Sequence, residues 1–292
     1  MTLFLEYLVV GLVEGFIIAT LAFAIVFLVK STGFVNFAQG AMSTLAAFVV
    51  YELYLRLHNT AEALVLGLLI TVAFSAGFFL LVIRPRASED HLNMLMRTVG
   101  IYLLIEAFIN LVWSVGQPFS LPQIFPATSA FELAGVVVSW NSVWTVLVTI
   151  ALMALFVGFF KFTNLGLLFV GFADNAAVAR LLGTRIRLLG LVAWMIAGIL
   201  GIVVGVLIEP STFLTTTMTD PILLFAFAAA VIGGLNSLTG AVIGGVVMGL
   251  ADVLLTAYTG SNSATVYVFL FVLVMLQIWP NGIFGQSSVE RL

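Results

Sequence analysis

The sequence predicts an all-α, polytopic membrane protein of about eight to ten transmembrane helices, with interrupted helices and a pseudo-repeat. Its 292 residues are 63% hydrophobic and only 8% charged, whereas about 25% of the residues of a soluble domain are charged. Its apolar stretches have about the 20 residues that a helix needs to cross a bilayer core. One polar motif interrupts two of these stretches at positions 200 residues apart.

Nine apolar segments are candidates for membrane spans. They cover residues 6–29, 34–55, 62–83, 98–115, 140–160, 188–208, 220–235, 240–257 and 265–280. The first follows a start that carries Glu6 and no basic residue. It is too long for the core of a signal peptide, so we expect a retained span. Segment 220–235 is short enough to be re-entrant.

Basic residues predict which loops face the cytoplasm, because lysine and arginine are enriched on that side. Seven of the ten flank two loops: Arg84, Arg86 and Arg97 the first, and Lys161, Arg180, Arg185 and Arg187 the second. Residues 116–139 and 209–220 contain no lysine or arginine and are expected to face outward. Near the N-terminus the rule is ambiguous, since Lys30 and Arg56 flank the same span.

The pattern G-x-x-N-x-x-x-G occurs at residues 33–40 and again at residues 233–240. Irregular backbone at membrane depth is tolerated only where protein or a water-filled cavity satisfies it, and paired interruptions point to a substrate pathway. We therefore predict a pathway lined by Asn36, Gln39, Gly40, Asn236 and Gly240. A chance match is the alternative in a chain with 26 glycines. The two breaks face one side if all nine segments cross, and opposite sides, as an inverted repeat, if one re-enters.

Pairs of glycines four residues apart predict close helix packing, because small residues let helix backbones approach. Such pairs are Gly11 and Gly15, Gly201 and Gly205, Gly240 and Gly244, and Gly245 and Gly249. Packing within the chain is the favoured interpretation, and contact with another subunit is the alternative.

A segment around residues 162–187 is less lipid-like than the spans beside it. Residues 172–183 predict a short helix with Asp174 near its start, Arg180 near its end and Gly183 as its stop. Such a helix on the cytoplasmic face suits either an intracellular partner or an anchor lying in the membrane interface.

Three acids lie within predicted spans, where ionisable residues are costly and are functional candidates by default. They are Glu14, Glu106 and Asp252, and no lysine or arginine lies deep in a span to pair with them. Isolated on three spans, they do not form a proton relay by themselves. Structural hydrogen bonding, pathway lining and proton chemistry all remain open for Glu14.

Composition and motifs exclude several other functions. The chain has no cysteine and only two histidines, so no metal site is expected. No basic face predicts nucleic-acid binding. No catalytic constellation is present, and neither lysine follows the glycine of a phosphate-binding loop. We therefore expect a non-enzymatic chain in the lipid bilayer, and any ATP would have to be bound by a separate chain.

The sequence resembles the LivH-type permeases of ABC importers for branched-chain amino acids, over nearly its whole length. The run 33–40 is similar to the family's G-x-[IV]-N-[FL]-[AS]-[HQ]-G segment, and the glycine-rich block 230–245 to its double-glycine block. Supporting similarities lie at residues 82–85, with the Gly100 span after them, and at 173–183 and 279–285.

The resemblance implies one permease domain over residues 1–292, with halves of about 1–115 and 140–285 and a cytoplasmic coupling segment at 162–187. It implies a second homologous permease chain, two ATPase subunits and an extracytoplasmic substrate-binding protein. ATP and Mg²⁺ would bind the ATPases, with no cofactor in this chain. Coupling would involve Asp174, Arg180 and Gly183, in a bacterial or archaeal cytoplasmic (inner) membrane.

Departures from the family pattern concern the substrate and the ATPase contact. Asn236 and Leu238 replace small residues, residues 166–170 lack two basic positions, and Glu14 and Glu106 replace usual apolar and glutamine residues. Branched-chain or other small hydrophobic amino acids are the expected substrates. Urea, short amides and aromatic or dicarboxylic acids are alternatives. So are an ion-coupled secondary transporter and a membrane scaffold without a pathway of its own.

Overall fold

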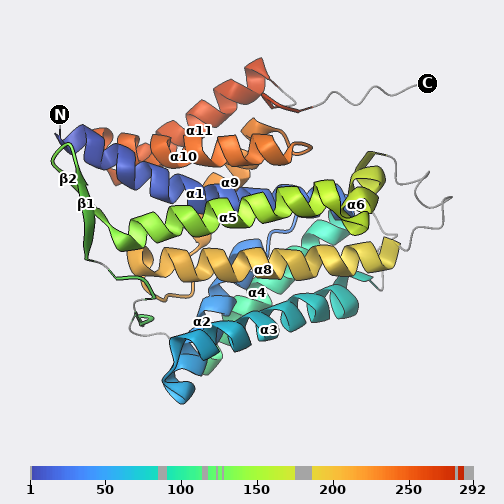
Figure 1. The fold of residues 1–292 in the computed structure, drawn as a ribbon. Coiled ribbons are helices and arrows are strands. Elements are labelled where there is room, and N and C mark those ends of the chain that lie inside the picture. The colour runs from blue at the N-terminus through green and yellow to red at the C-terminus, as the bar shows by residue number, and fades with distance from the viewer. Residues whose placement is uncertain are drawn as a thin grey trace. The chain divides into compact units, whose positions relative to one another are not determined.

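The computed structural model describes residues 2–84, 91–113, 118–122, 124–126, 128–174, 186–279 and 282–285. The chain divides into two compact units. Unit 1 contains residues 1–26, 125–150 and 222–292, and unit 2 contains residues 27–124 and 151–221. Both are built mainly from long helices (Figure 1).

Each of the nine predicted segments falls on a helix, which confirms the all-α fold class. The helices are α1 (Thr2–Thr32), α2 (Gln39–Leu57), α3 (Thr60–Phe78) with the π-helix η1 (Phe79–Ile83), α4 (His91–Trp113), α5 (Trp140–Phe162), α6 (Asn164–Asp174), α8 (Ile186–Thr212), α9 (Asp220–Gly233), α10 (Leu238–Thr259) and α11 (Ser261–Ile278). Six described helices are long and apolar enough to cross a membrane. The 14 residues of α9 rise only about 21 Å, less than the roughly 30 Å core.

Two boundaries and one loop differ from the predictions. The helix α4 begins at His91 rather than near residue 98, and α8 runs to Thr212, so Glu209 is helical and not part of a loop. The predicted outward loop contains an antiparallel hairpin of β1 (Ser129–Leu133) and β2 (Val136–Ser139). Its turn residues Ala134 and Gly135 both have positive φ, as a tight hairpin turn of type I′ requires.

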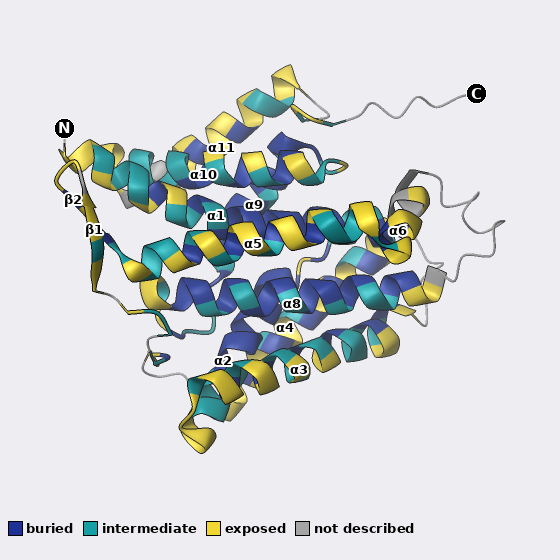
Figure 2. Ribbon diagram, in the orientation of Figure 1, coloured by how far each residue is buried: buried dark blue, intermediate teal, exposed yellow. Residues whose placement is uncertain are grey.

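In unit 2 the helix α2 lies at the centre, packed against α3, α4 and α8, and α3 also packs against α8. Eleven of the nineteen residues of α2 are buried, and Figure 2 shows α2 and α8 mostly in the colour of buried residues. Since this helix is enclosed by protein, it tolerates more polar residues than a helix that faces lipid.

Contacts within unit 2 show that its basic residues lie at two opposite ends. The ring of Phe27 lies 5.3 Å from that of Phe160, so the Lys30 end of α1 adjoins the Lys161 end of α5. At the opposite end Phe119 pairs with Leu214. There Arg56 forms an ion pair with Glu52 at 2.7 Å. Lys30 and Arg56 therefore belong to opposite ends of unit 2.

Unit 1 is held by backbone-to-backbone packing at glycines. A Cβ on Gly245 would meet the Ala19 backbone, a Cβ on Gly249 would meet Gly15, and one on Gly11 would meet Leu250. The helix α10 thus runs antiparallel to α1, and the predicted small-residue packing is confirmed within the chain. Gly135 of the hairpin contacts Thr2, beside the first turn of α1.

Candidate functional site

The first break, residues 33–38 between α1 and α2, is closed by the side chain of Asn36. Gly33 ends α1 with φ +84°, a conformation that favours glycine. Asn36 Oδ1 accepts from the backbone N–H of Ala38 at 3.0 Å, and its Nδ2 donates to Gln39 Oε1 at 3.3 Å. Asn36 is fully buried, so its amide replaces hydrogen bonds that the interrupted helix leaves unmade.

Gln39 ties this break to α8. Its Nε2 donates to the carbonyl of Ala197 at 3.0 Å, and the side chain is fully buried. A Cβ on Gly201 would stand 3.5 Å from that nitrogen. At Gly205 a Cβ would strike the carbonyl of Ser43. The predicted Gly201–Gly205 face therefore carries α8 directly against the first turns of α2.

A further set of buried polar contacts surrounds the break in unit 2. The hydroxyl groups of Thr44 and Thr219 lie 2.7 Å apart, and both are fully buried. Tyr102 donates its hydroxyl to Asp220 Oδ2 at 3.1 Å. Sequence reasoning missed these residues because the partners are 175 and 118 positions apart. In the sequence these residues stand out only as a threonine or an aspartate beside an apolar stretch, which does not indicate a contact.

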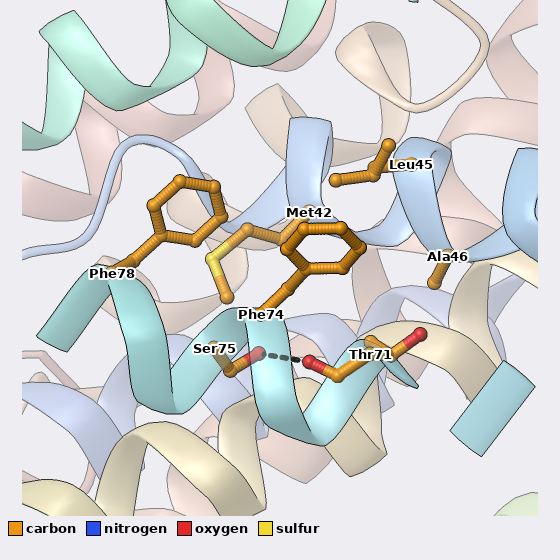
Figure 3. Close-up of a pocket in the computed structure, with 7 residues that line it drawn as sticks. All are labelled: Met42, Leu45, Ala46, Thr71, Phe74, Ser75 and Phe78. Atoms are coloured by element: carbon orange, nitrogen blue, oxygen red, sulfur yellow. Dashed lines mark hydrogen bonds between the residues drawn. The ribbon is translucent and has the colours of Figure 1, made fainter. Parts of the chain in front are cut away.

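A small cavity lies between α2 and α3 (Figure 3). It is lined by Met42, Leu45, Ala46, Thr71, Phe74, Ser75 and Phe78 and has a volume of about 10 Å³. Thr71 Oγ1 is buried and has no hydrogen-bond partner among the described residues. The cavity has about the volume of a single water molecule, so it admits nothing as large as an amino acid.

In the second break, residues 234–237 in unit 1, a different residue type caps the helix that follows the break. Gly234 has φ +97°, and Ser237 Oγ accepts from the N–H of Gly240 at 3.0 Å to cap α10. Gly233 and Gly240 touch backbone to backbone. Asn236, by contrast, is exposed.

The C-terminal turn of residues 282–285 covers the end of α9. The N–H of Ile283 donates to the carbonyl of Ile232 at 2.8 Å, and that of Phe284 to Gly233 at 3.3 Å. Gly282 has φ +79° and packs on Gly234. The final carbonyl groups of a helix need partners from outside that helix, and this glycine-containing turn supplies two of them.

The predicted pathway residues therefore fall in two places. Asn36, Gln39 and Gly40 are buried together in unit 2, whereas Asn236 lies within the second break and Gly240 lies in the first turn of α10, both in unit 1. For the predicted coupling set, Asp174 is the last residue of α6, and Arg180 and Gly183 lie outside the described residues. In the described part of the chain no cluster of metal-ligating side chains occurs.

The intramembrane acids are not isolated, which corrects the expectation. In unit 1 the carboxyl groups of Glu14 on α1 and Asp252 on α10 lie close enough to interact electrostatically. In unit 2 Tyr102, one turn before Glu106 on α4, donates its hydroxyl to Asp220 at the start of α9.

Comparison with known proteins identifies the family. The family described as "Branched-chain amino acid transport system / permease component" matches residues 7–278. The chain belongs to this permease family. The predictions of a LivH-type permease subunit of an importer and of a multi-pass membrane protein are thereby confirmed.

Full-length relatives agree with this assignment. The permease is 24% identical to the high-affinity branched-chain amino acid transport system permease protein LivH of Salmonella typhimurium, over 99% of this chain and 98% of LivH. Its identity to BraD of Pseudomonas aeruginosa is also 24%, with the same coverage. A probable branched-chain amino acid transport permease of Methanocaldococcus jannaschii is 26% identical over 90% of this chain and 87% of the relative.

A solved structure shares the fold. PsaBC from Streptococcus pneumoniae, in complex with Fab, superposes with a TM-score of 0.50 at 14% identity. The match covers 94% of this permease and 93% of the solved chain. It therefore supports the helical architecture over nearly the full length.

Proposed function

We propose that this permease forms half of the translocation pathway of an ATP-driven importer for branched-chain or other small hydrophobic amino acids. The family match over residues 7–278 carries the proposal, and the names of LivH and BraD support the substrate class. A second homologous permease chain would complete the pathway. Two ATPase subunits would bind ATP and Mg²⁺, and an extracytoplasmic binding protein would deliver the solute at a bacterial or archaeal cytoplasmic membrane.

The helix α8 offers a mechanical connection between the proposed coupling segment and the first break. It begins at Ile186, directly after the segment 172–183, and continues without interruption to Thr212. Ala197, whose carbonyl accepts from Gln39, lies eleven residues along α8, which is about 16 Å at the usual rise per residue. Movement at the cytoplasmic end of α8 would thus act directly on the residues that close the break.

The glycine face of α8 suits such a movement. Gly198, Gly201 and Gly205 present no side chain towards Ser75 of α3 and Ser43 of α2. A helix surface without projecting side chains meets fewer steric barriers when it shifts past its neighbours. ATP binding by the partner subunits would favour one access state, because a ligand shifts an equilibrium only by its different affinity for the two states.

The test is leucine uptake into proteoliposomes that contain this permease assembled with its second permease chain, the ATPases and the binding protein. Uptake should require ATP inside the vesicle on the ATPase side and should survive a protonophore. Unlabelled isoleucine and valine should compete, whereas urea and short amides should not. Competition by urea, amides or dicarboxylates alone would reassign the substrate.

The alternative hypothesis is an ion-coupled transporter. The proximity of the Glu14 and Asp252 carboxyl groups favours it. It predicts uptake that continues without ATPase subunits and collapses with a protonophore. The variant Glu14→Gln separates the two readings. It should leave ATP-driven uptake largely intact under our proposal and abolish uptake under proton coupling.

A further inference from the structure

An apolar groove opens between α3 and α4 in unit 2. Its volume is about 540 Å³, and its lining carries almost no polar surface. The lining residues are Leu45, Ile70, Ala73, Phe74, Gly77, Phe78, Leu81, Leu104, Ile105 and Phe108. Leu45 of α2 and Ile105 of α4 are buried, at 5% and 1% exposure, and form the floor.

The side chains that form the walls of the groove are exposed on the surface of unit 2. Leu81 is 80% exposed and Leu104 is 62% exposed. Phe74 and Phe78 line both this groove and the small cavity of Figure 3. An exposed apolar surface of this kind marks a contact with another apolar molecule, and α3 and α4 both have the length and composition of membrane spans.

The length of the groove matches one leaflet. Along α3 and η1 its lining runs from Ile70 to Leu81. Eleven helical steps rise about 16 Å, and half of the hydrocarbon core is about 15 Å. A crossing helix of a partner chain would instead contact α3 along its whole span. The groove therefore fits an extended acyl chain of a single leaflet better than a second helix.

Positive charge marks one end of the groove. Arg84 is exposed and follows Leu81, the last lining residue of η1, by three positions. Arg97 lies two turns from Leu104 on α4, and its guanidinium donates to the carbonyl of Val82 in η1 at 2.9 Å. This bond joins the ends of the two walls. Two arginines at the predicted cytoplasmic end present the charge that a phosphate headgroup needs.

We propose that the α3–α4 groove is a binding site for an anionic phospholipid of the cytoplasmic leaflet. One acyl chain lies along the groove between Ile70 and Leu81, and the phosphate headgroup contacts Arg84 and Arg97. This site is separate from the first break and adds a lipid ligand to the proposed transport function.

The experiment uses the assembled complex in nanodiscs with a photoreactive phosphatidylglycerol whose diazirine is in the acyl chain, against the matched phosphatidylcholine. Phosphatidylglycerol should label peptides from residues 70–81 and 101–108 more strongly than phosphatidylcholine. The variant Arg84→Gln should lower that preference about fivefold, the effect of one charge near a membrane surface. Arg97→Gln should do the same, and Arg97→Lys should keep it.

A steric variant tests the acyl chain separately. A Cβ on Gly77 meets nothing within 4 Å, so Gly77→Leu should fill the groove without disturbing the fold and abolish labelling by both lipids. Gly158 of α5 is equally open and is not a groove residue. The control Gly158→Leu should therefore leave labelling unchanged.

Equal labelling by the two lipids that is unchanged in Arg84→Gln, Arg97→Gln and Gly77→Leu would identify ordinary lipid around the protein and overturn the proposal. The proposal would also be overturned if neither lipid labelled the wild-type protein and cross-links showed that a partner subunit covers residues 70–81. Both results leave the proposed transport function untouched, because neither depends on uptake.

Discussion

Asn36 and Asn236 occupy the same place in a repeated motif and have different physical roles. Asn36 is fully buried, and both ends of its amide are hydrogen-bonded. Asn236 is exposed, because the neighbouring Ser237 provides the oxygen that caps α10. Short polar side chains at a helix start compete for the same free N–H groups, and the motif alone does not decide which one succeeds.

This difference predicts unequal effects of one substitution. Asn36→Leu removes an acceptor from the N–H of Ala38 and a donor from Gln39, so it should lower the free energy of unfolding by about 1–3 kcal/mol. Asn236→Leu, at an exposed position, should change it by no more than about 0.5 kcal/mol. Thermal unfolding in detergent measures both. Equal destabilisation by the two variants would contradict the assignment of Asn36 as the residue that closes the first break.

At the residue scale, sequence analysis singled out one residue of several contacts but did not identify the residue that it contacts. Gln39 was singled out as a pathway residue, whereas its acceptor is a backbone carbonyl 158 positions away. Because every residue has a backbone carbonyl, neither composition nor periodicity can predict which carbonyl accepts this hydrogen bond. Glu14 and Asp252 were named separately, and only the packing of α1 on α10 brings them together. The C-terminal turn was noticed as a motif, without its contact to α9.

At the element scale the sequence was more informative. The apolar lengths predicted all the longer helices, because crossing a bilayer fixes length and composition together. The short helix α6 was not among the predicted segments. The spacing of small residues also predicted which helix faces approach closely, as Gly245 and Gly249 confirm against α1. The hairpin β1–β2 was missed because its strands are only five and four residues long.

The α1–α10 contact gives the element-scale prediction. A side chain at Gly245 would overlap the backbone of Ala19, so the two helices would have to separate. Gly245→Leu should therefore destabilise the protein by roughly 1–3 kcal/mol or more, as overpacking does, and lower the melting temperature in detergent. Gly158→Leu introduces the same side chain into open space and is the matched control. A Gly245→Leu protein as stable as this control would refute the backbone contact.

At the scale of the whole molecule, the few charges orient the chain in the membrane. Arg56 and Arg84 are both exposed and stand at opposite ends of unit 2, the first in an ion pair with Glu52 and the second in the predicted cytoplasmic group. The distribution of basic residues in short loops sets orientation. Helix contacts remove the ambiguity that sequence left near Lys30, because the aromatic rings of Phe27 and Phe160 place that lysine beside Lys161.

Orientation leads to a direct labelling prediction, since the chain contains no cysteine and the unmodified protein provides a blank. In intact cells a membrane-impermeant maleimide should react with Arg56→Cys and not with Arg84→Cys. After permeabilisation both variants should react, because both positions are exposed. Reaction of Arg84→Cys from outside would invert the assigned orientation. It would also place the proposed coupling segment on the side of the membrane where no ATP is available, so the importer mechanism depends on this result.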